Sequence, residues 1–320
     1  MTAASLAVVM SMTSCGGPGT AESETGSARG DYPITIDHVF GSTTIPEKPE
    51  RVVALGVTDA DVVLALGTVP VGNAGFVFYD DGLGPWADEL VGDEPLTHLA
   101  SDSEPDLEVI AGLEPDVIIG VSAGFDEGTY DALSAIAPTV ARPAGTAAYA
   151  VGRETATEII ARTMGEEELG AQLNAEADAV IEQVKTDNPE FADSSAVAVL
   201  PYDGQFGAFL PGDARGEFLT SLGFEIPDAV LAQDDGTSFF VPVAAENVSV
   251  LDSDLILYLG SDENVDVVQE NPLFGTLTAG RNDAIIATTI DQRGAISYNT
   301  VLSIPYAVDQ LVPRIEQAVS

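Results

Sequence analysis

The chain has 320 residues, 45% of them hydrophobic, which is enough for two hydrophobic cores of ordinary domain size. Its 52 acidic residues against 11 Lys and Arg give a formal net charge of −41, which argues against binding to nucleic acid or to anionic lipid, because both need a basic surface. One cysteine and two histidines argue against a disulfide framework and against a zinc, copper or manganese site, so we predict no metal site in the protein itself.

The first 15 residues have the pattern of an export signal. A short run of small and apolar residues, Ala3–Met12, is followed by Ser14, Cys15 and Gly16, and this resembles a bacterial lipoprotein signal with its lipobox. In such signals the cysteine becomes the lipidated first residue of the mature protein. Residues 16–30 have almost nothing to bury, so we predict a flexible tether between a lipid anchor at Cys15 and the folded part.

Residues 31–148 are predicted to form an N-terminal α/β lobe. The strand predicted over Asp116–Val121 is almost entirely apolar, which is typical of a parallel strand covered on both faces. The other elements predicted in this lobe are the strands Arg51–Leu55, Val69–Val71 and Thr139–Ala141 and the helix Asp59–Leu66. Strands that alternate with helices predict a parallel sheet with right-handed crossovers.

Residues 149–190 are predicted to be a helical region that contains one long connecting helix. Between Glu166 and Asp187, apolar residues recur at helical spacing and form a single stripe made of Leu169, Leu173, Ala177, Val180 and Val184. A helix of this length is about 30 Å long. We expect it to act as a strut that permits only small movements of the lobes on either side.

Residues 191–320 are predicted to form a C-terminal α/β lobe. Its first strand, Ala196–Pro201, is expected to form a hairpin with Gly207–Pro211. Further extended segments are predicted at Ser238–Val243, Asp254–Leu259 and Ala284–Thr289, and a closing helical segment at Val301–Val319.

A repeated pattern relates the two lobes. Glu108–Ile118 and Glu246–Ile256 lie 138 positions apart and share a Glu, a Leu five residues later, an Asp eight residues later and a following apolar run. Each copy predicts a short helix, a tight turn and a buried strand, with a carboxylate at the start of the helix. The sequence therefore predicts an α/β fold of two similar lobes with central, mostly parallel sheets joined by one long helix.

One pattern suggests an enzyme. Gly120, Ser122 and Gly124 follow an apolar strand, as in the nucleophile turn of α/β hydrolases. That fold needs its catalytic acid and histidine after the serine, and the only histidines, His38 and His98, precede it. A serine hydrolase using Ser122 is therefore a distant alternative, and we predict no catalytic residues.

The predicted loops at the carboxyl ends of the strands carry aromatic residues and a few arginines. Aromatic walls with isolated Arg residues suit a large, flat, partly anionic ligand held by stacking and by charge-assisted hydrogen bonds. The candidate ligand-binding residues are Tyr79, Trp86, Tyr202, Phe206, Arg215, Arg293 and Tyr298.

Four segments resemble a known family, the substrate-binding proteins of ABC importers that capture ferric siderophores, with cobalamin and haem binders as relatives. The resemblance rests on Ile45–Leu55, Asp106–Ile119, Glu246–Leu259 and Ser303–Leu311 and extends from about Tyr32 to the C-terminus. It implies a non-enzymatic, monomeric binding protein at the cell surface or in the periplasm, anchored by lipid to the outer face of the cytoplasmic membrane.

The resemblance also implies the partners. A ferric siderophore or related chelate would bind in a shallow cleft between the lobes, with no cofactor and with iron only as part of the bound chelate. One Glu from each lobe would dock on Arg residues of the ABC permease, and these positions match Glu108 and Glu246. The negative charge of the chain favours a near-neutral, hydroxamate-type chelate, because it would repel an anionic one. Cobalamin or haem remains the alternative ligand.

Overall fold

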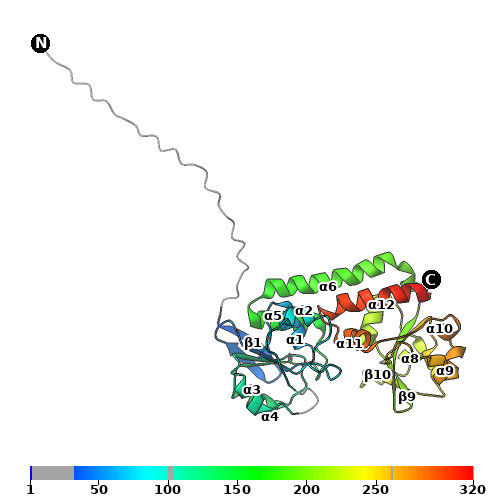
Figure 1. The fold of residues 1–320 in the computed structure, drawn as a ribbon, viewed down its shortest axis with the longest axis horizontal. Helices are drawn as coiled ribbons and strands as arrows, with labels where there is room; N and C mark the ends of the chain where they lie inside the picture. Colours follow the sequence, from blue (N-terminus) through cyan, green and yellow to red (C-terminus); the bar gives the residue numbers. More distant parts are fainter. Residues whose placement is uncertain (2–31, 100–103, 261, 320) are drawn as a thin grey trace.

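The computed structural model describes Met1 and residues 32–99, 104–260 and 262–319. The lipidation site at Cys15, the rest of the predicted signal after Met1 and the tether over residues 16–30 lie outside the described residues. Figure 1 shows two lobes side by side, with α6 (Glu167–Asp187) running along one edge of both. The predicted α/β fold, with two mostly parallel sheets joined by one long helix, is confirmed.

The N-terminal lobe is built on a five-stranded sheet whose pairings are all parallel. Its strands in spatial order are β5 (Thr97–His98), β4 (Gly72–Asn73), β3 (Val52–Ala54), β6 (Val117–Gly120) and β7 (Thr139–Ala141). The helices of this lobe are α1 (Asp59–Ala65), α2 (Asp88–Val91), α3 (Leu107–Gly112) and α4 (Glu127–Ser134). An antiparallel hairpin, β1 (Ile34–His38) and β2 (Gly41–Ile45), was not predicted and adds three isoleucines to the core of the lobe.

The C-terminal lobe has a five-stranded mixed sheet. Its strands in spatial order are β10 (Phe240–Ala244), β9 (Gln205–Phe209), β8 (Ala196–Tyr202), β11 (Leu255–Tyr258) and β12 (Ile285–Ala287). β9 is antiparallel to both of its neighbours, as the predicted hairpin requires, and the other pairings are parallel. The helices are α7 (Ala214–Ser221), α8 (Asp228–Leu231), α9 (Val267–Glu270), α10 (Thr278–Arg281), α11 (Ile290–Tyr298) and α12 (Ser303–Val319), with short 3-10 helices η1 (Pro189–Asp193), η2 (Val248–Leu251) and η3 (Pro272–Thr276).

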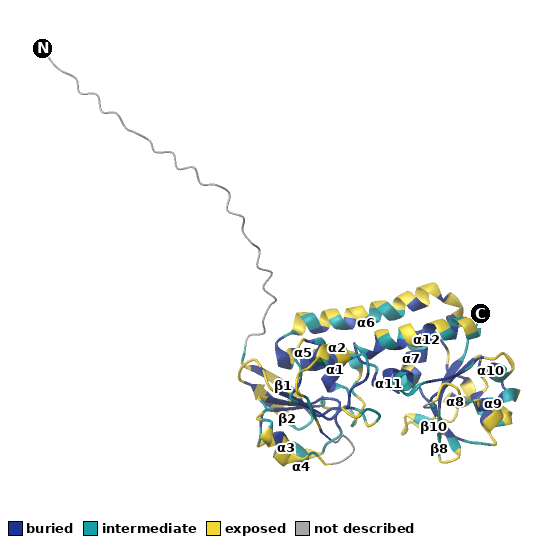
Figure 2. Cartoon of the chain, in the orientation of Figure 1, coloured by how far each residue is buried: buried dark blue, intermediate teal, exposed yellow. Residues whose placement is uncertain are grey.

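One long helix, α6, connects the lobes. α5 (Arg153–Met164) ends at Gly165, whose left-handed backbone (φ 67°) suits glycine, and the chain then enters α6. Leu169 and Leu173 of α6 pack on the core of the N-terminal lobe, whereas Val184 belongs to the core of the C-terminal lobe. Figure 2 shows the exposed residues of α6 on the side facing away from the lobes. The predicted apolar stripe therefore packs one straight helix against both cores.

The two copies of the repeat form different kinds of short helix. The first copy forms α3 followed by β6, but the second forms only the 3-10 helix η2 before β11. η2 has four residues, two of them valines, and such short β-branched segments favour the tighter 3-10 form over an α-helix. The predicted short helix, turn and buried strand are therefore present in both copies, with a 3-10 helix in the second.

A buried carboxylate holds two loops of the N-terminal lobe together at the carboxyl ends of β3 and β6. Asp59 is 0% exposed and accepts hydrogen bonds from the backbone N–H groups of Gly56, Val121 and Ser122 at 2.9–3.0 Å and from the Ser122 hydroxyl at 2.6 Å. Burial raises the pKa of Asp59, and these hydrogen bonds oppose that rise. The network positions both loops at the edge of the sheet that faces the other lobe.

Candidate ligand-binding site

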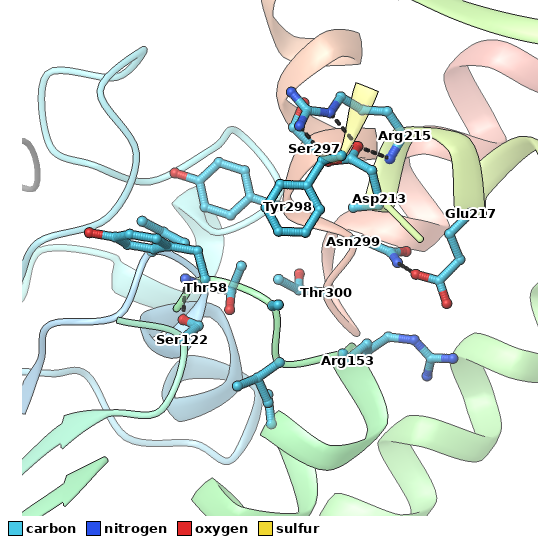
Figure 3. Close-up of a pocket in the computed structure, with 18 of the residues that line it drawn as sticks. Thr58, Ser122, Arg153, Asp213, Arg215, Glu217, Ser297, Tyr298, Asn299 and Thr300 are labelled. Carbon is cyan, nitrogen blue, oxygen red and sulfur yellow. Dashed lines mark hydrogen bonds and ion pairs between the residues drawn. The ribbon is translucent and has the colours of Figure 1, made fainter. Parts of the chain in front are cut away.

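A cavity of about 360 Å³ lies between the two lobes. The N-terminal lobe contributes loop residues that include Thr58, Phe76, Ser122 and Tyr149, α5 contributes its first turn, and the C-terminal lobe contributes Asp213, Arg215, Phe239 and Tyr298. Figure 3 shows Thr58, Ser122 and Tyr298, which are far apart in the sequence, close together around this cavity. The carboxyl ends of parallel strands meet at this position, which is where α/β proteins of this kind bind ligands.

Arg215 is held rigidly on the wall of the cavity. Its Nε donates to Asp213 Oδ1 at 2.6 Å and its Nη2 donates to Asp213 Oδ2 at 2.7 Å, so the ion pair is bidentate (Figure 3). The guanidinium also lies over the Phe209 ring, 3.7 Å from the ring centre. Asp213 caps α7 by accepting from the Arg215 backbone N–H, and this fixes both residues at the start of the helix. The remaining guanidinium N–H groups are available to a ligand in a known orientation.

Arg293 lies close to this wall without lining the cavity. Its guanidinium stacks over the Phe78 ring at 4.3 Å. Partial burial, and next the positive charge of Arg215, lower the pKa of Arg293. Phe78 packs on Phe76, and Phe76 packs on Tyr298 at 4.3 Å between ring centres. The predicted residues Arg293 and Tyr298 are thus linked through an aromatic cluster, and Arg215 lies near enough for its charge to act on Arg293.

Tyr79 and Trp86 lie where the two lobes meet and do not line the cavity. Tyr79 packs against α11 at Gly294, where there is no room for a Cβ atom, and the Trp86 ring lies 5.5 Å from the Tyr298 ring. Tyr298 itself is buried and its hydroxyl donates to the Gly82 carbonyl oxygen at 3.2 Å. The aromatic loop after β4 therefore packs the N-terminal lobe onto the C-terminal lobe.

A second buried carboxylate links the lobes behind these rings. Asp61 is 1% exposed, and its Oδ2 accepts from the Trp86 indole N–H at 2.7 Å and from the Thr300 hydroxyl at 2.6 Å. Its Oδ1 is buried and has no hydrogen-bond partner among the described residues. Burial raises the pKa of Asp61 to about 6, against the effect of the two hydrogen bonds. This contact joins α1 to the turn that follows α11.

Tyr202 and Phe206 lie in a different place. They line a separate pocket of the C-terminal lobe, beside the hairpin of β8 and β9, together with Glu246 and Glu270. Glu246 is exposed, two residues beyond the end of β10, and Glu108 is exposed in the first turn of α3. Figure 1 shows α3, β9 and β10 on the side of the molecule away from α6. The two glutamates therefore belong to elements on the same side of the two lobes.

Ser122 has the bonding pattern of a structural residue. Its hydroxyl donates to Asp59 and accepts from the Thr58 backbone N–H at 3.0 Å. The side chain is 3% exposed, and neither His38 nor His98 is among its hydrogen-bond partners. A nucleophile needs a neighbouring base within hydrogen-bond reach, so the geometry gives no support to the hydrolase alternative.

Several cavity residues were not predicted from the sequence. They include Thr58, Tyr149, Arg153, Phe239 and Asn299. The sequence did contain a signal for Arg153. Gly152 and Gly165 flank the twelve-residue helix α5 as its N-cap and C-cap, and recognising these caps would have placed Arg153 at the first position of a helix separate from α6. Tyr149 and Phe239 are exposed loop residues, and no periodic pattern marks such positions.

The described part of the chain holds no group of three or more His, Cys, Asp or Glu side chains arranged to bind a metal ion. Across residues 32–99, 104–260 and 262–319, none of the helices combines the length and the apolar character needed to cross a membrane.

Comparisons with known proteins agree with the fold. A family model described as periplasmic binding protein matches residues 52–291. The Fe(3+)-citrate-binding protein YfmC of Bacillus subtilis is 31% identical over 249 residues, which cover 77% of this chain and 75% of that protein. A periplasmic solute binding protein of Mycobacterium smegmatis has a TM-score of 0.79 and 34% identity, covering 90% of this chain and 99% of the solved one. PiaA of Streptococcus pneumoniae, solved in complex with ferrichrome, has a TM-score of 0.74 and 28% identity, and the match covers 89% of this chain and 98% of PiaA. The family match spans most of the chain, and the protein therefore belongs to the periplasmic binding protein family.

Proposed function

We propose that this protein is an extracytoplasmic substrate-binding protein that captures a ferric siderophore between its lobes and delivers it to an ABC permease. The observation that carries the proposal is the inter-lobe cavity with aromatic walls and one rigidly held arginine, Arg215. Relatives named as binders of ferric citrate and ferrichrome share the fold over most of its length. The protein acts by binding and release, without catalysing a reaction.

The chelate is recognised by its organic shell. Phe76, Phe239 and Tyr298 offer apolar and aromatic surface to this shell, and Arg215 donates hydrogen bonds to an exposed oxygen atom of the chelate. The bidentate pair with Asp213 neutralises much of the charge of Arg215. The cavity wall therefore distinguishes one chelate from another by the direction of its hydrogen bonds more than by the net charge of the chelate. Tyr79 and Trp86 support this wall from behind by ordering Tyr298.

Delivery uses the face that carries Glu108 and Glu246. Both side chains are exposed, and they belong to elements on the same side of the two lobes, away from α6. We propose that each carboxylate meets an arginine of the permease. Exposed ion pairs contribute about 0–1 kcal/mol each, so the two pairs set orientation and association rate more than affinity. A lipid anchor at Cys15 and the tether over residues 16–30 keep the monomeric protein at the outer face of the cytoplasmic membrane.

Replacing Arg215 by alanine tests the cavity. We expect the affinity for ferric citrate, measured by isothermal titration calorimetry, to fall about tenfold or more, because a hydrogen bond to a charged group contributes about 1.5–3 kcal/mol. Arg281→Ala is the matched control, since Arg281 is an exposed arginine of α10 that does not line the cavity. Equal affinities of the wild type and Arg215→Ala would show that the chelate binds elsewhere.

A further inference from the structure

The inner end of the cavity is formed by the first turn of α5. Gly152, Arg153, Ala156 and Thr157 line it, so the start of this twelve-residue helix faces the space between the lobes. The N-cap is Gly152, which has no side chain to accept hydrogen bonds from the first N–H groups of the helix. These N–H groups and the helix dipole together favour a negatively charged oxygen at this position.

An independent observation points to a ligand at the same place. Thr157 is 0% exposed and lines the cavity, yet its Oγ1 has no hydrogen-bond partner among the described residues. An unpartnered buried hydroxyl costs free energy unless something bonds to it when the site is filled. In contrast, Thr163, two turns further along α5 and also 0% exposed, donates its hydroxyl to the Ile159 carbonyl oxygen at 2.8 Å. These two buried threonines of α5 thus differ, because only the Thr157 hydroxyl lacks a hydrogen-bond partner among the described residues.

The charged neighbours leave this position open to an anion. The Arg153 guanidinium donates to Asp178 at 2.5 Å and to Asn174, which directs it towards α6, and its charge is partly neutralised there. Figure 3 shows Arg153 and Glu217 on the same side of the cavity, with Glu217 bound by the Asn299 amide at 2.9 Å. Glu154, in the same turn, is exposed, lies 4.0 Å from the Arg153 guanidinium and does not line the cavity. The positive potential that the first turn of α5 presents to the cavity therefore comes from its N–H groups, and the Thr157 hydroxyl lies in the same lining.

We propose that the first turn of α5 and Thr157 form a subsite for a carboxylate group of the bound chelate. The carboxylate accepts hydrogen bonds from the first N–H groups of α5 and from the Thr157 hydroxyl, while the iron-bearing part of the chelate lies against the aromatic wall and Arg215. This inference rests on the proposed function and deepens it. It assigns the cargo to ferric chelates that carry a free carboxylate arm, such as citrate-type siderophores, over those that carry none. This replaces the hydroxamate-type chelate expected from the net charge, because the potential at the first turn of α5 acts at shorter range than the charge of the whole chain.

A charge placed at the N-cap tests the subsite without disturbing the fold. A Cβ atom at Gly152 meets nothing within 4 Å, and its φ of −68° is allowed for any residue. Asp is a favoured N-cap residue, so Gly152→Asp should fold normally while its carboxylate occupies the N–H groups and repels the ligand. Gly152→Asn has the same size and caps the helix without a charge. We expect Gly152→Asp to lower the affinity for ferric citrate at least about tenfold, and Gly152→Asn to lower it about two- to threefold.

The hydroxyl is tested by Thr157→Val, with Thr163→Val as the same substitution on the same helix outside the cavity. Thr157→Val should weaken ferric citrate binding about tenfold, and Thr163→Val should change it less than about twofold. Ferrichrome, which has no free carboxylate, should bind all four variants within about twofold of the wild type. Thermal unfolding of each variant confirms that the fold is intact.

The outcomes separate the two proposals. The subsite is wrong if Gly152→Asp and Thr157→Val bind ferric citrate as the wild type does, if ferrichrome is weakened equally, or if the wild type binds ferrichrome but not ferric citrate. In each of these cases siderophore capture still stands. Wild-type protein that binds neither of these chelates nor a ferric catecholate would overturn both the proposed function and the subsite.

Discussion

Replacing both Glu108 and Glu246 by alanine is expected to slow chelate uptake about tenfold or more while leaving chelate affinity unchanged. The two carboxylates are exposed on elements at the same side of the lobes, and neither lines the inter-lobe cavity. Removing them takes away the charges that orient the protein on the permease, so association should slow by about tenfold or more. Transport assayed in reconstituted vesicles, with affinity measured on the free protein, checks both halves of the expectation.

The matched control is Glu176→Ala with Glu182→Ala on the exposed face of α6. It also removes two negative charges, but from the opposite edge of the molecule. Uptake by this control should equal that of the wild type. If the control loses uptake as well, the effect arises from net charge. If the Glu108 and Glu246 variant loses chelate affinity, these carboxylates take part in ligand binding.

Asp61→Asn is expected to stabilise the protein at pH 7.5 by about 2–3 kcal/mol, with the gain vanishing near pH 4. Burial raises the pKa of Asp61 from an ordinary value of 3.8 to about 6, so above pH 6 the folded protein holds a buried charge that the unfolded chain would keep in water. A difference of about 2 pKa units corresponds to about 3 kcal/mol. Wild-type stability should therefore rise as the pH falls from about 6 to about 4, because only the folded state binds this proton in that window.

Chemical denaturation of the wild type and Asp61→Asn from pH 4 to pH 8 gives the two stability curves. Asn keeps an acceptor oxygen for Trp86 and Thr300, so the contact between the lobes persists in the variant. Asp59 also has a raised pKa and contributes a pH dependence of the same sign, but it is present in both proteins and cancels in the difference. Asp88→Asn, at an exposed position of α2, should run parallel to the wild type. If the stability curves of Asp61→Asn and the wild type run parallel from pH 4 to pH 8, Asp61 does not contribute to the pH dependence of stability.

Much of the fold was predictable because it follows from patterns within short segments of the sequence. The apolar runs of β6 and β11, the period of α6 and the turn before each buried strand are all properties of short segments. The sequence did not distinguish the 3-10 helix η2 from the α-helix of the first copy. The prediction also did not include the β1–β2 hairpin, whose isoleucines gain their burial only by packing on the first lobe.

The site was less predictable because it depends on which way loop side chains turn. The aromatic loop after β4 was identified, but the sequence does not show that Trp86 turns towards Asp61 and Thr300, a residue more than 200 positions later. Likewise, Arg215 could be placed in a loop but not in a bidentate pair with the residue two positions before it. Contacts between lobes are set by the assembled tertiary structure, which no local pattern encodes.

The contacts between the lobes indicate a body that moves little on binding. Asp61 bonds to Thr300, Tyr298 bonds to Gly82, and α6 packs on the cores of both lobes. A large hinge opening would break all of these contacts at once. The spacing between Glu108 and Glu246 should therefore be nearly the same with and without cargo, and the permease would recognise a largely preformed surface.

Fluorescence titration of Trp86 with ferric siderophores tests the central claim most directly. Trp86 is the only tryptophan of the chain, and its ring lies 5.5 Å from Tyr298 on the wall of the cavity. A light-absorbing ferric chelate bound between the lobes should quench it in a saturable way at one chelate per protein, and the iron-free siderophore should have little effect. The absence of any saturable response to citrate, hydroxamate and catecholate complexes, or a response to cobalamin or haem alone, would contradict capture of a ferric siderophore in this cavity.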